Sequence, residues 1–546
     1  MKHVLWVVEE RIKKVKLDGW HAVFAFLFAG MLLLSRHVIN QVVDVSTVDT
    51  AYIIDFHWFD FVIFLVLLPV CYLLTETVSW LCSIITPHLF ETGRTKKWWL
   101  VIVFTPLVFI CWIPYLMSFR PGGIYFDTVE SLDIALGNTT MNSHHPVLYT
   151  LLWKFVFWIT GAFKDGGVYK GLNLFTELQC LFLAAALSYF LYLCYRWGLK
   201  KKGIALGVIL TAVFPLYPFY GISLWKDTIF SIVVFLLVIY LYSFFREWKE
   251  SASVGDLILY VILLAATAFF RNNGIYVAII LMIGLFLVCI WNHKKLAFQF
   301  AGVSAGVIIV SAVILGPVFA GLGYHIDTKS ESLGIPIQQV AYILSTDGNL
   351  EEADLELLNE IMPLEEWKAQ YDPLVADTIK FTPEFNKAVF EDRSDEFLKT
   401  YLQLVKKNPV KAVKAYFLAT LGFWDIFESS PTAYISNFHF SNANYFMSDY
   451  FDYYLDFSFA KIVEPRKYIS CAFMVWILLF TLCECLSKKN YKGLISLTPT
   501  FGIWMTIMAA TPIANSFRYI YPLFLCIPIY LLTLSDCHRC KREVLT

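Results

Sequence analysis

The chain has 546 residues, of which 58% are hydrophobic, 17% aromatic and only 16% charged. A soluble protein of this length would carry about a quarter charged residues, so this composition indicates an integral membrane protein. The formal net charge of −1 argues against a nucleic-acid partner, which would need a basic face, and no such partner is expected. None of the twelve cysteines lies between residues 320 and 465, so the largest polar region is not a disulfide scaffold.

The first sixteen residues, MKHVLWVVEERIKKVK, are charged and amphipathic, and they lack the apolar core and small-residue cleavage site of a secretory signal. No cleavage is therefore expected. An apolar run needs about 20 residues to span about 30 Å of hydrocarbon. Twelve runs are read as spans, near 20–36, 59–79, 98–118, 171–195, 203–219, 227–245, 255–270, 274–291, 297–319, 468–486, 493–510 and 519–535.

A thirteenth apolar run, 146–162, begins at Pro146 and carries Lys154. Clusters of Lys and Arg lie in the N-terminal lead-in and near 94–97, 196–202, 246–249, 294–295, 488–492 and 539–542. If the thirteenth run stays on the outer side, every cluster falls in the cytoplasm; if it crosses, clusters before and after it face opposite sides. We therefore predict a polytopic α-helical protein with about 12 transmembrane helices, both termini in the cytoplasm, and an interfacial or re-entrant helix at 146–162.

This topology predicts a multi-pass protein of the plasma membrane, divided into five parts. They are N-terminal transmembrane helices (1–118), an outer loop with juxtamembrane helices (119–170), a transmembrane core (171–319), an extracytoplasmic domain (320–465), and C-terminal transmembrane helices with a cytoplasmic tail (466–546). The extracytoplasmic domain is expected to be mainly helical, because segments such as LEEADLELLNEIMPLEEW place apolar residues at helical spacing.

The outer loop contains a predicted amphipathic helix at 127–136, which Gly137 ends. Asp127 and Glu130 share its polar side, turned to water or to a cleft. The same spacing also fits a solvated acidic loop without chemistry. The pattern therefore predicts a helix lying on the membrane and leaves the chemistry of its carboxylates open.

His144 and His145 follow, directly before Pro146. They are candidate hydrogen-bond donors to a phosphate, since histidine titrates near neutral pH; the alternative is simple polarity at a helix entry. Adjacent histidines point in different directions and do not readily ligate one ion, so a metal site is not indicated. Cys537 and Cys540 have the spacing of a zinc ligand pair, but no second pair accompanies them.

Three further polar groups recur at predicted outer helix ends. They are Lys226-Asp227, Arg271-Asn272-Asn273 and Arg518-Tyr519. Charges at helix ends reach the interface at little cost, so each group alone fits a topology anchor. Together, the three cations could converge on one anionic group. The residues leave both interpretations open.

An early outer-loop Asp, a following His-Pro helix that does not cross, and many short-looped spans resemble the GT-C superfamily of membrane glycosyltransferases, of the protein O-mannosyltransferase and aminoarabinose-transferase type. The elements FDTVES…HHPVLYTLL, LWKDTIF, FRNNGIYV, SLGIPIQQVAYIL with YDPLVADTIK, and SFRYIYPLF are similar to those of a largely Gram-positive bacterial multi-pass family of unassigned function with GT-C character. The resemblance covers most of residues 119–535. It departs from the superfamily in two respects: the usual partner acid has no clear equivalent, and 320–465 does not resemble the β-rich domains of some relatives.

The resemblance implies a sugar donor on polyprenyl phosphate, an acceptor in the cell envelope, and an active site on the extracytoplasmic face. It matches the superfamily's acidic residue to Asp127 as general base, and Glu130 is the second candidate catalytic residue. The candidates for binding substrate or phosphate are His144, His145, Lys226, Asp227, Arg271, Asn272, Asn273, Arg518 and Tyr519. No cofactor or metal is indicated, and the residues leave the oligomeric state open.

Two other classes of function fit parts of the pattern. Twelve spans with cytoplasmic termini also describe transporters or flippases of envelope precursors, although these usually show paired halves and polar residues near mid-membrane. A polymerase or ligase of surface glycans, or a non-catalytic membrane scaffold, also fits a multi-pass chain with an outer domain. A polymerase or ligase would use a pyrophosphate-linked donor, so the donor separates it from a monosaccharide transferase.

Overall fold

The computed structural model describes residues 17–543 except 45–48, 92, 143–144, 163–166, 248–249, 292, 325–328, 429–469 and 515. The charged lead-in and His144, on which the sequence raised expectations, lie outside the described residues. The described chain divides into two compact units. The first contains residues up to His88, Ile477–Leu494 and residues from Tyr530 onward; the second contains Leu89–Trp476 and Ile495–Ile529.

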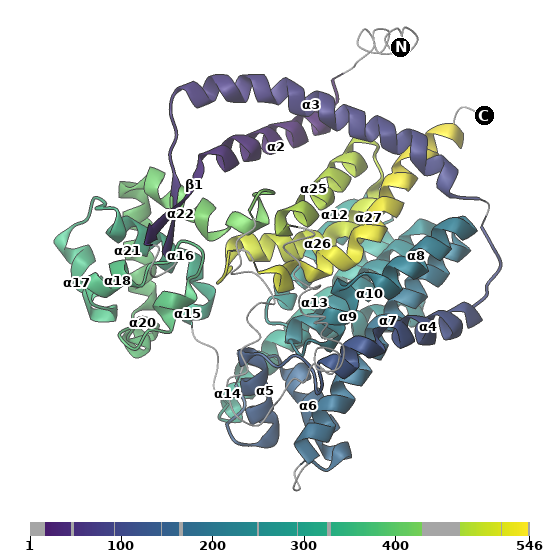
Figure 1. The fold of residues 1–546 in the computed structure, drawn as a ribbon, viewed down its shortest axis with the longest axis horizontal. Helices are drawn as coiled ribbons and strands as arrows, with labels where there is room; N and C mark the ends of the chain where they lie inside the picture. Colours follow the sequence, from purple (N-terminus) through teal and green to yellow (C-terminus); the bar gives the residue numbers. More distant parts are fainter. Residues whose placement is uncertain are drawn as a thin grey trace. The chain divides into compact units, whose positions relative to one another are not determined.

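Helices make up most of both units (Figure 1). One antiparallel hairpin, β1 (Val38–Asp44) with β2 (Asp49–Ile54), belongs to the first unit. All twelve predicted spans are helical. Seven helices in the described residues are long and apolar enough to cross a membrane, which establishes a multi-pass membrane protein. They are α2 (Gly19–His37), α3 (Phe59–Ile85), α4 (Trp99–Ser118), α7 (Gly167–Arg196), α10 (Lys226–Glu247), α13 (Lys294–Val313) with its continuation to Gly321, and α27 (Phe517–Glu543).

An eighth crossing is formed if α8 (Lys201–Val213) and α9 (Leu216–Ile222) act as one span, with a bend of 46° between them. Of the twelve predicted spans, seven or eight are thus supported by helix length and composition. The other predicted runs form α11 (Val254–Phe270), α12 (Gly274–Cys289), α25 (Cys471–Ser487) and α26 (Tyr491–Ala509). The first three of these have only 16 or 17 residues, which is about 24–26 Å of helix. Twelve crossings and the side that each loop faces stay predictions.

The outer loop folds into the two helices that the sequence predicted. α5 (Phe126–Leu136) ends at Gly137, whose φ of +84° is the left-handed conformation that glycine tolerates best. α6 (Val147–Thr160) begins after Pro146 and has 14 residues, about 21 Å, which is too short to cross about 30 Å of hydrocarbon. The two helices pack on each other (Figure 1).

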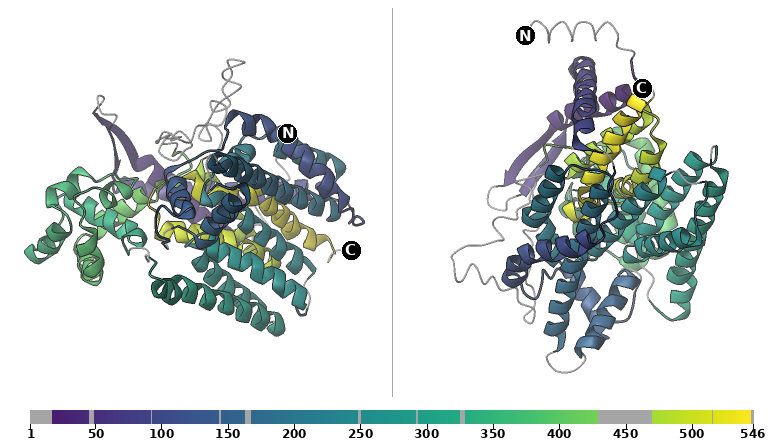
Figure 2. Two further views of the ribbon diagram at one scale, coloured as in Figure 1. Left: turned by 90° about the horizontal axis from the view of Figure 1, so that it is seen from below. Right: turned by 90° about the vertical axis from the view of Figure 1, so that its right-hand side faces the viewer.

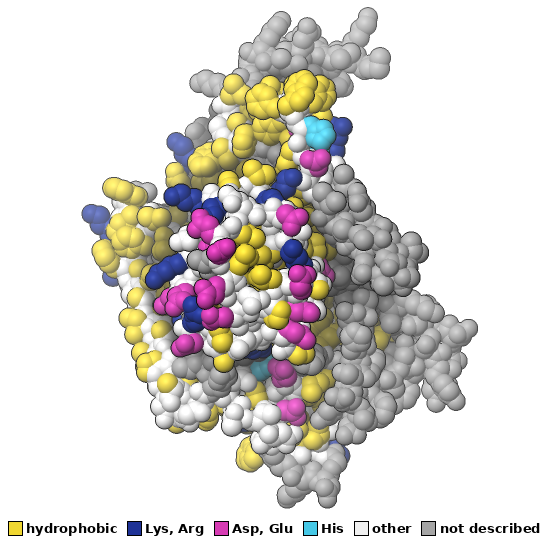
Figure 3. Space-filling view, turned by 90° about the vertical axis from the view of Figure 1, so that its left-hand side faces the viewer, with side chains coloured by type: hydrophobic (Ala, Val, Ile, Leu, Met, Phe, Trp, Pro, Cys, Tyr) yellow, Lys and Arg dark blue, Asp and Glu magenta, His cyan; other side chains and the backbone are white. Residues whose placement is uncertain are grey.

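The region 320–465, predicted from the sequence to be an extracytoplasmic domain, is helical over its described part. Its helices are short and packed together in the left view of Figure 2, where they are green. They are α15 (Lys329–Ser332), α16 (Gly334–Ser345), α17 (Glu352–Ile361), α18 (Leu364–Ala369), α19 (Asp377–Lys380), α20 (Lys387–Asp392), α21 (Ser394–Lys407) and α22 (Pro409–Ala419). Trp367 is fully buried in their core, and its indole donates a hydrogen bond to the carbonyl of Leu358 at 3.0 Å. Acidic and basic side chains lie side by side on this domain (Figure 3).

The remaining elements are short. They are η1 (Thr86–Leu89), η2 (Ile314–Val318), α14 (Phe319–Gly321) and η3 (Leu421–Phe423). A buried apolar cluster joins α10, α11, α12 and α13 within the second unit; Tyr260 and Ser304 hydrogen-bond to each other at 2.8 Å inside it. The second unit thereby holds α10 and α11 together, and the charged ends of these two helices belong to the candidate site.

Candidate functional site

The site is built where two extended segments pair side by side, one before α5 and one before α10. Gly123 and Ser223 form a parallel bridge: the Gly123 amide donates to the carbonyl of Ile222, and the Leu224 amide donates to the carbonyl of Gly123, both at 2.8 Å. Each segment then enters a helix. Because the strands are parallel, the first turns of α5 and α10 start beside each other, and these turns carry the charged residues predicted from the sequence.

The pairing needs close backbone approach and full use of backbone polar groups. At Gly122, with a φ of +132°, a Cβ would meet both the Thr176 hydroxyl and the carbonyl of Ile222, so a side chain does not fit. The Gln179 amide donates to the carbonyls of Gly221 and Ser223, at 2.8 Å each. Irregular backbone within a membrane protein is stable only when such groups are satisfied internally, and Gln179 supplies two of these bonds.

A second pair of hydrogen bonds fixes the same segment from the outer-loop helices. The hydroxyls of Thr128 on α5 and Tyr149 on α6 both donate to the carbonyl of Leu224, at 2.7 and 2.6 Å. Neither residue was singled out from the sequence. Their bonds tie α5 and α6 to the entrance of α10.

Asp127 lies in the first turn of α5 and is shared by two cations. One carboxylate oxygen lies 2.9 Å from the guanidinium of Arg518, in the first turn of α27, and 3.9 Å from the ammonium of Lys226, at the start of α10. The Asp127 side chain is 27% exposed, so this cluster is open to a ligand. Three residues far apart in the sequence, each predicted separately, thus meet at one carboxylate.

The next residue along α10 forms a closed ion pair. Asp227 is 2% exposed and lies 2.6 Å from the guanidinium of Arg271, the residue that ends α11. A buried carboxylate of this kind needs its partner, because an unpaired charge is poorly tolerated away from water. The pair therefore joins α10 to α11 and is not free to bind a ligand.

Aromatic rings orient the two arginines. Tyr519 lies next to both, with the Arg271 guanidinium 4.8 Å and the Arg518 guanidinium 5.0 Å from its ring centre. Arg518 also lies 5.4 Å from the ring of Trp225, which stacks on Tyr125 with centroids 3.6 Å apart. Cation–π contacts and stacking of this kind favour fixed guanidinium positions. Trp225 and Tyr125 were missed from the sequence, although Trp225 directly precedes Lys226.

Glu130 and His145 pair with each other, one turn along α5 from Asp127. The Nε2 atom of His145 lies 2.6 Å from a Glu130 oxygen, and its Nδ1 lies 3.1 Å from the Ser131 hydroxyl. His145 is 2% exposed with both ring nitrogens engaged. This arrangement makes His145 a link between α5 and the entrance of α6, where it positions the turn that carries Asp127.

The remaining predicted residues lie in the turn between α11 and α12. Asn272 and Asn273 are both partly buried there. Asn273 lines a small crevice together with Arg271, Phe230 and Thr506. The structure therefore places this turn beside the closed Arg271 pair, while the open carboxylate belongs to Asp127.

The helical domain is attached to the same site through backbone hydrogen bonds. The Ala376 amide donates to the carbonyl of Pro512 at 2.8 Å, and the Ala514 amide donates to the carbonyl of Leu374 at 2.7 Å. The bonded loop leads directly into the first turn of α27. Leu374 and Ala376 of the domain are thus hydrogen-bonded to a loop that lies only a few residues before Arg518 in the sequence.

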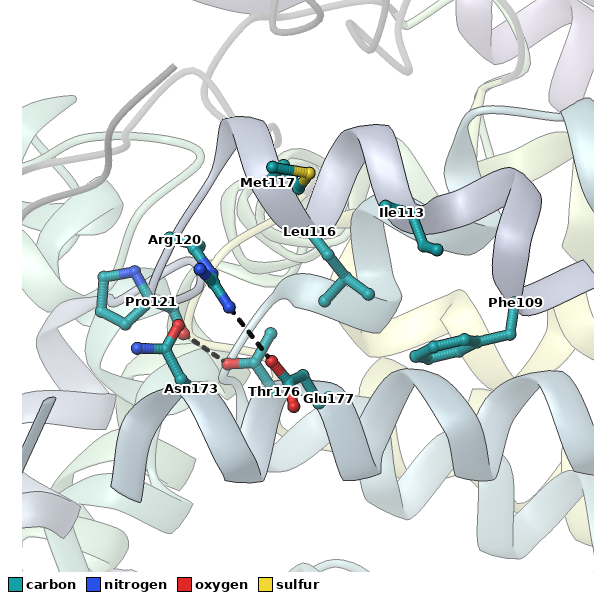
Figure 4. A pocket seen from close by; sticks show the side chains of 9 residues that line it. All are labelled: Phe109, Ile113, Leu116, Met117, Arg120, Pro121, Asn173, Thr176 and Glu177. Carbon is teal, nitrogen blue, oxygen red and sulfur yellow. Dashed lines mark hydrogen bonds and ion pairs between the residues drawn. The ribbon is translucent and has the colours of Figure 1, made fainter. Parts of the chain in front are cut away.

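A cavity of about 260 Å³ lies between α4 and α7, near the site but lined by other residues (Figure 4). Phe109, Ile113 and Leu116 of α4 point towards α7, and Arg120 lies 3.4 Å from Glu177 at one end. Its walls contain none of the residues around Asp127. The charged cluster lies elsewhere, and its chemistry does not depend on this cavity.

No group of three or more His, Cys, Asp and Glu side chains among the described residues could hold a metal ion. The carboxylates of the site face arginine and lysine. What the arrangement can do is bind an anion beside Asp127 and accept a proton on that carboxylate.

A sequence family described as a family of unknown function (DUF6020) matches residues 134–544. Because the match covers most of the chain, the chain belongs to this family. No curated protein and no solved structure matches it. The matched stretch contains the cations of the site but begins after Asp127 and Glu130.

Proposed function

We propose that this member of the DUF6020 family is a membrane glycosyltransferase that moves a sugar from a polyprenyl-phosphate carrier to an acceptor hydroxyl of the cell envelope. The acceptor would be a surface polysaccharide, a teichoic acid, a lipid or a protein on the outer side of the plasma membrane. The observation that carries the proposal is Asp127, one partly exposed carboxylate shared by the cations of Arg518 and Lys226.

The charges of the site favour a singly charged donor. The three cations outnumber the two carboxylates by one. Because the Asp227–Arg271 pair is neutral, the excess positive charge lies beside Asp127. A phosphodiester carries one negative charge and would neutralise it, whereas a pyrophosphate carries more charge than the site offers. This argument favours a monophosphate-linked sugar over the pyrophosphate-linked donor of a polymerase or ligase.

Donor binding would also release the base. A phosphate beside Arg518 and Lys226 competes with Asp127 for the same cations, so the carboxylate becomes free to accept a proton. The acceptor oxygen then forms a bond to the anomeric carbon, the bond from that carbon to the phosphate oxygen breaks, and the acceptor proton passes to Asp127. A positioned general base contributes roughly 10²–10⁴-fold to such a step.

The leaving phosphate gains negative charge as its bond to the sugar breaks. Fixed cations that need no rearrangement stabilise that charge best. Arg518 is held by Trp225 and Tyr519, so its guanidinium stays in place for the phosphate. A single displacement of this kind inverts the anomeric configuration. The helical domain, bonded to the loop before α27, would contribute to selecting the acceptor.

The test is transfer of radiolabelled sugar from polyprenyl-phosphate donors by the full-length protein in membranes. We expect Asp127→Asn to lose transfer by roughly 10²–10⁴-fold, since an amide cannot take the acceptor proton. The matched control is Asp133→Asn on the same helix, where the side chain contacts Asn138 and not the cations; it should keep wild-type transfer.

Three outcomes contradict different parts of the proposal. If Asp127→Asn transfers sugar as fast as wild type, Asp127 is not the base. If wild-type protein consumes no lipid-linked sugar but shows counterflow of an envelope precursor, the chain is a transporter. Consumption of pyrophosphate-linked donors alone would instead identify a polymerase or ligase.

A further inference from the structure

A second cluster of ionisable side chains lies inside the first unit, where α2, α3, α25 and α27 meet. The ring of His21 on α2 lies between two carboxylates: its Nδ1 is 2.7 Å from an oxygen of Glu76 on α3, and its Nε2 is 3.0 Å from an oxygen of Glu484 on α25. His21 and Glu484 are buried, with side-chain exposures of 1% and 0%. None of these residues was singled out from the sequence.

Two basic side chains complete the surroundings of Glu484. Its other oxygen lies 3.7 Å from the ammonium of Lys488 and 3.6 Å from the ring of His538 on α27. Ionisable groups inside spanning helices are rare and are usually tied to function. No metal site explains this cluster, because none is found among the residues that the structure describes.

The geometry requires one more proton than separate groups would hold. A neutral imidazole has one N–H donor and one bare nitrogen, so it can donate to only one of two carboxylates. If Nδ1 donates to Glu76, the bare Nε2 would lie 3.0 Å from a buried Glu484 oxygen, with two lone pairs close together. This close approach is favourable only if the ring carries two protons, or if Glu76 or Glu484 is itself protonated.

Burial of Glu484 favours the same result. Its side chain is 0% exposed, and a charge away from water is strongly unfavourable unless it is compensated. A proton held by His21 or by one of the two glutamates lowers the negative charge at this position.

Several other titratable groups face the cluster from each of its helices. They are Asp18 at the start of α2, Tyr72 and Cys82 on α3, Cys483 and Cys485 on α25, and Asp536, Cys537 and His538 on α27. Asp18 accepts a hydrogen bond from the hydroxyl of Ser487 at 2.5 Å. The proton is assigned to the histidine and the two glutamates, because the His21 ring lies within 3.0 Å of both carboxylates.

We infer that His21, Glu76 and Glu484 form a proton-binding site that fastens α2 and α3 to α25 within the first unit. The family match begins at residue 134, so α2 and α3 lie outside it, while α25 lies within it. The bound proton thus joins an N-terminal helical pair to helices of the family's common part. The inference is independent of the glycosyltransferase proposal, because it uses none of the residues around Asp127.

The proton itself is the measured ligand. In full-length protein labelled with ¹⁵N-histidine in lipid nanodiscs at about pH 7, we expect either the imidazolium signature for His21 or, by infrared spectroscopy, one protonated carboxyl that Glu76→Gln or Glu484→Gln removes. Assignment of the His21 resonance comes from His21→Gln. A neutral His21 together with two ionised glutamates in the folded wild-type protein overturns the inference, whatever the variants do.

Stability against pH gives a second measurement. The proton is held by the folded chain, so its contribution is present at acid pH and is lost as pH rises through the value at which it leaves. Between about pH 6 and about pH 9, the Tm of wild type and of the exposed-residue control His57→Gln should fall, and His21→Gln should lose that fall. Identical pH profiles for His21→Gln and wild type would contradict the inference. Glu76→Gln, at a half-exposed position, tests the site if Glu484→Gln does not fold.

Discussion

Two polar clusters in this chain use the same groups, a carboxylate among cations, and differ in how far they are buried. Asp127 in the second unit is 27% exposed and lies 2.9 Å from the guanidinium of Arg518. Glu484 in the first unit is fully buried between His21 and Lys488. A carboxylate that a ligand can reach can exchange its cation for an anion, whereas an enclosed carboxylate can exchange only a proton. Exposure, more than residue type, separates a binding site from a buried clamp.

Substitution of Asp227 tests whether the Asp227–Arg271 ion pair, next to the cluster around Asp127, serves stability and not ligand binding. Because Arg271 would be left as a buried unpaired charge, Asp227→Asn should lower the free energy of unfolding by about 3–5 kcal/mol. Thermal unfolding of the purified protein in detergent measures it as a drop in Tm. The double variant Asp227→Asn with Arg271→Met should recover most of the loss. If the single variant is as stable as wild type, the Asp227–Arg271 pair does not stabilise the fold, and Arg271 could bind a ligand as proposed for Arg518.

Substitution of Arg518 tests whether the partly exposed cluster around Asp127 acts on the donor phosphate. Arg518→Met should reduce sugar transfer by about 10²–10³-fold, because the leaving phosphate loses its fixed guanidinium, while Tm changes little. Arg518→Lys should restore only part of the activity, since an ammonium cannot reproduce the planar fork. The control Arg120→Met removes a half-exposed arginine paired with Glu177 and should keep full activity. A large loss of Tm in Arg518→Met, with transfer per folded molecule unchanged, would place Arg518 among the structural pairs.

Lys380 in the helical domain extends the comparison to a third place. It is fully buried between Asp377 and Glu331, whose carboxylate oxygens lie 2.8 and 2.9 Å from its ammonium. Burial lowers the pKa of Lys380, but the attraction of the two carboxylates outweighs this effect, so the pKa is raised overall. Lys380→Met should destabilise the domain by about 1–3 kcal/mol, measured by limited proteolysis and Tm. Lys368→Met, which removes an exposed pair with Asp347, is the matched control and should have a smaller effect. Equal effects would show that burial does not set the strength of these pairs.

Substitution of Asp372 should change the free energy of unfolding least, and it should raise that free energy instead of lowering it. Burial raises the pKa of Asp372 above its ordinary value of 3.8, although the amides of Leu374 and Val375 lower it in part. The folded chain therefore holds that proton more tightly, and the stability it brings is present at acid pH and lost as pH rises through the raised value. At neutral pH, Asp372→Asn should gain on the order of 0.5 kcal/mol, and the gain should vanish at acid pH. A loss at neutral pH would mean that the charge itself is needed.

Much of the fold was predictable from apolar runs alone. Every run read as a span is mainly helical, and the prediction from the Lys and Arg clusters that 146–162 does not cross agrees with the 14-residue length of α6. The number of crossings was not settled by runs of residues, because α11, α12 and α25 are apolar but short and α8 and α9 form a bent pair. Hydropathy identifies buried helices and spanning helices by the same signal.

The candidate site was predictable as a set of isolated signals. Asp127, Lys226 and Arg518 are charged residues at helix ends in an otherwise apolar chain, so each was visible in the sequence. Their meeting was not, because it depends on parallel pairing of Gly123 with Ser223, a hundred residues apart. The cluster around His21 was missed for the related reason that each member is a single polar residue in an apolar run.

The sequence by itself determined the class of this protein: composition and apolar runs require a polytopic helical membrane protein, and helix-end charges mark the positions where polar chemistry is permitted. The tertiary structure alone decided which charges meet and which are exposed. A single carboxylate in an otherwise apolar chain has the same local signal whether it lies partly exposed beside Arg518 or enclosed beside His21. Packing between distant helices determines how far water reaches each carboxylate. That access determines whether a carboxylate can give up its cation to an anionic ligand or can only bind a proton.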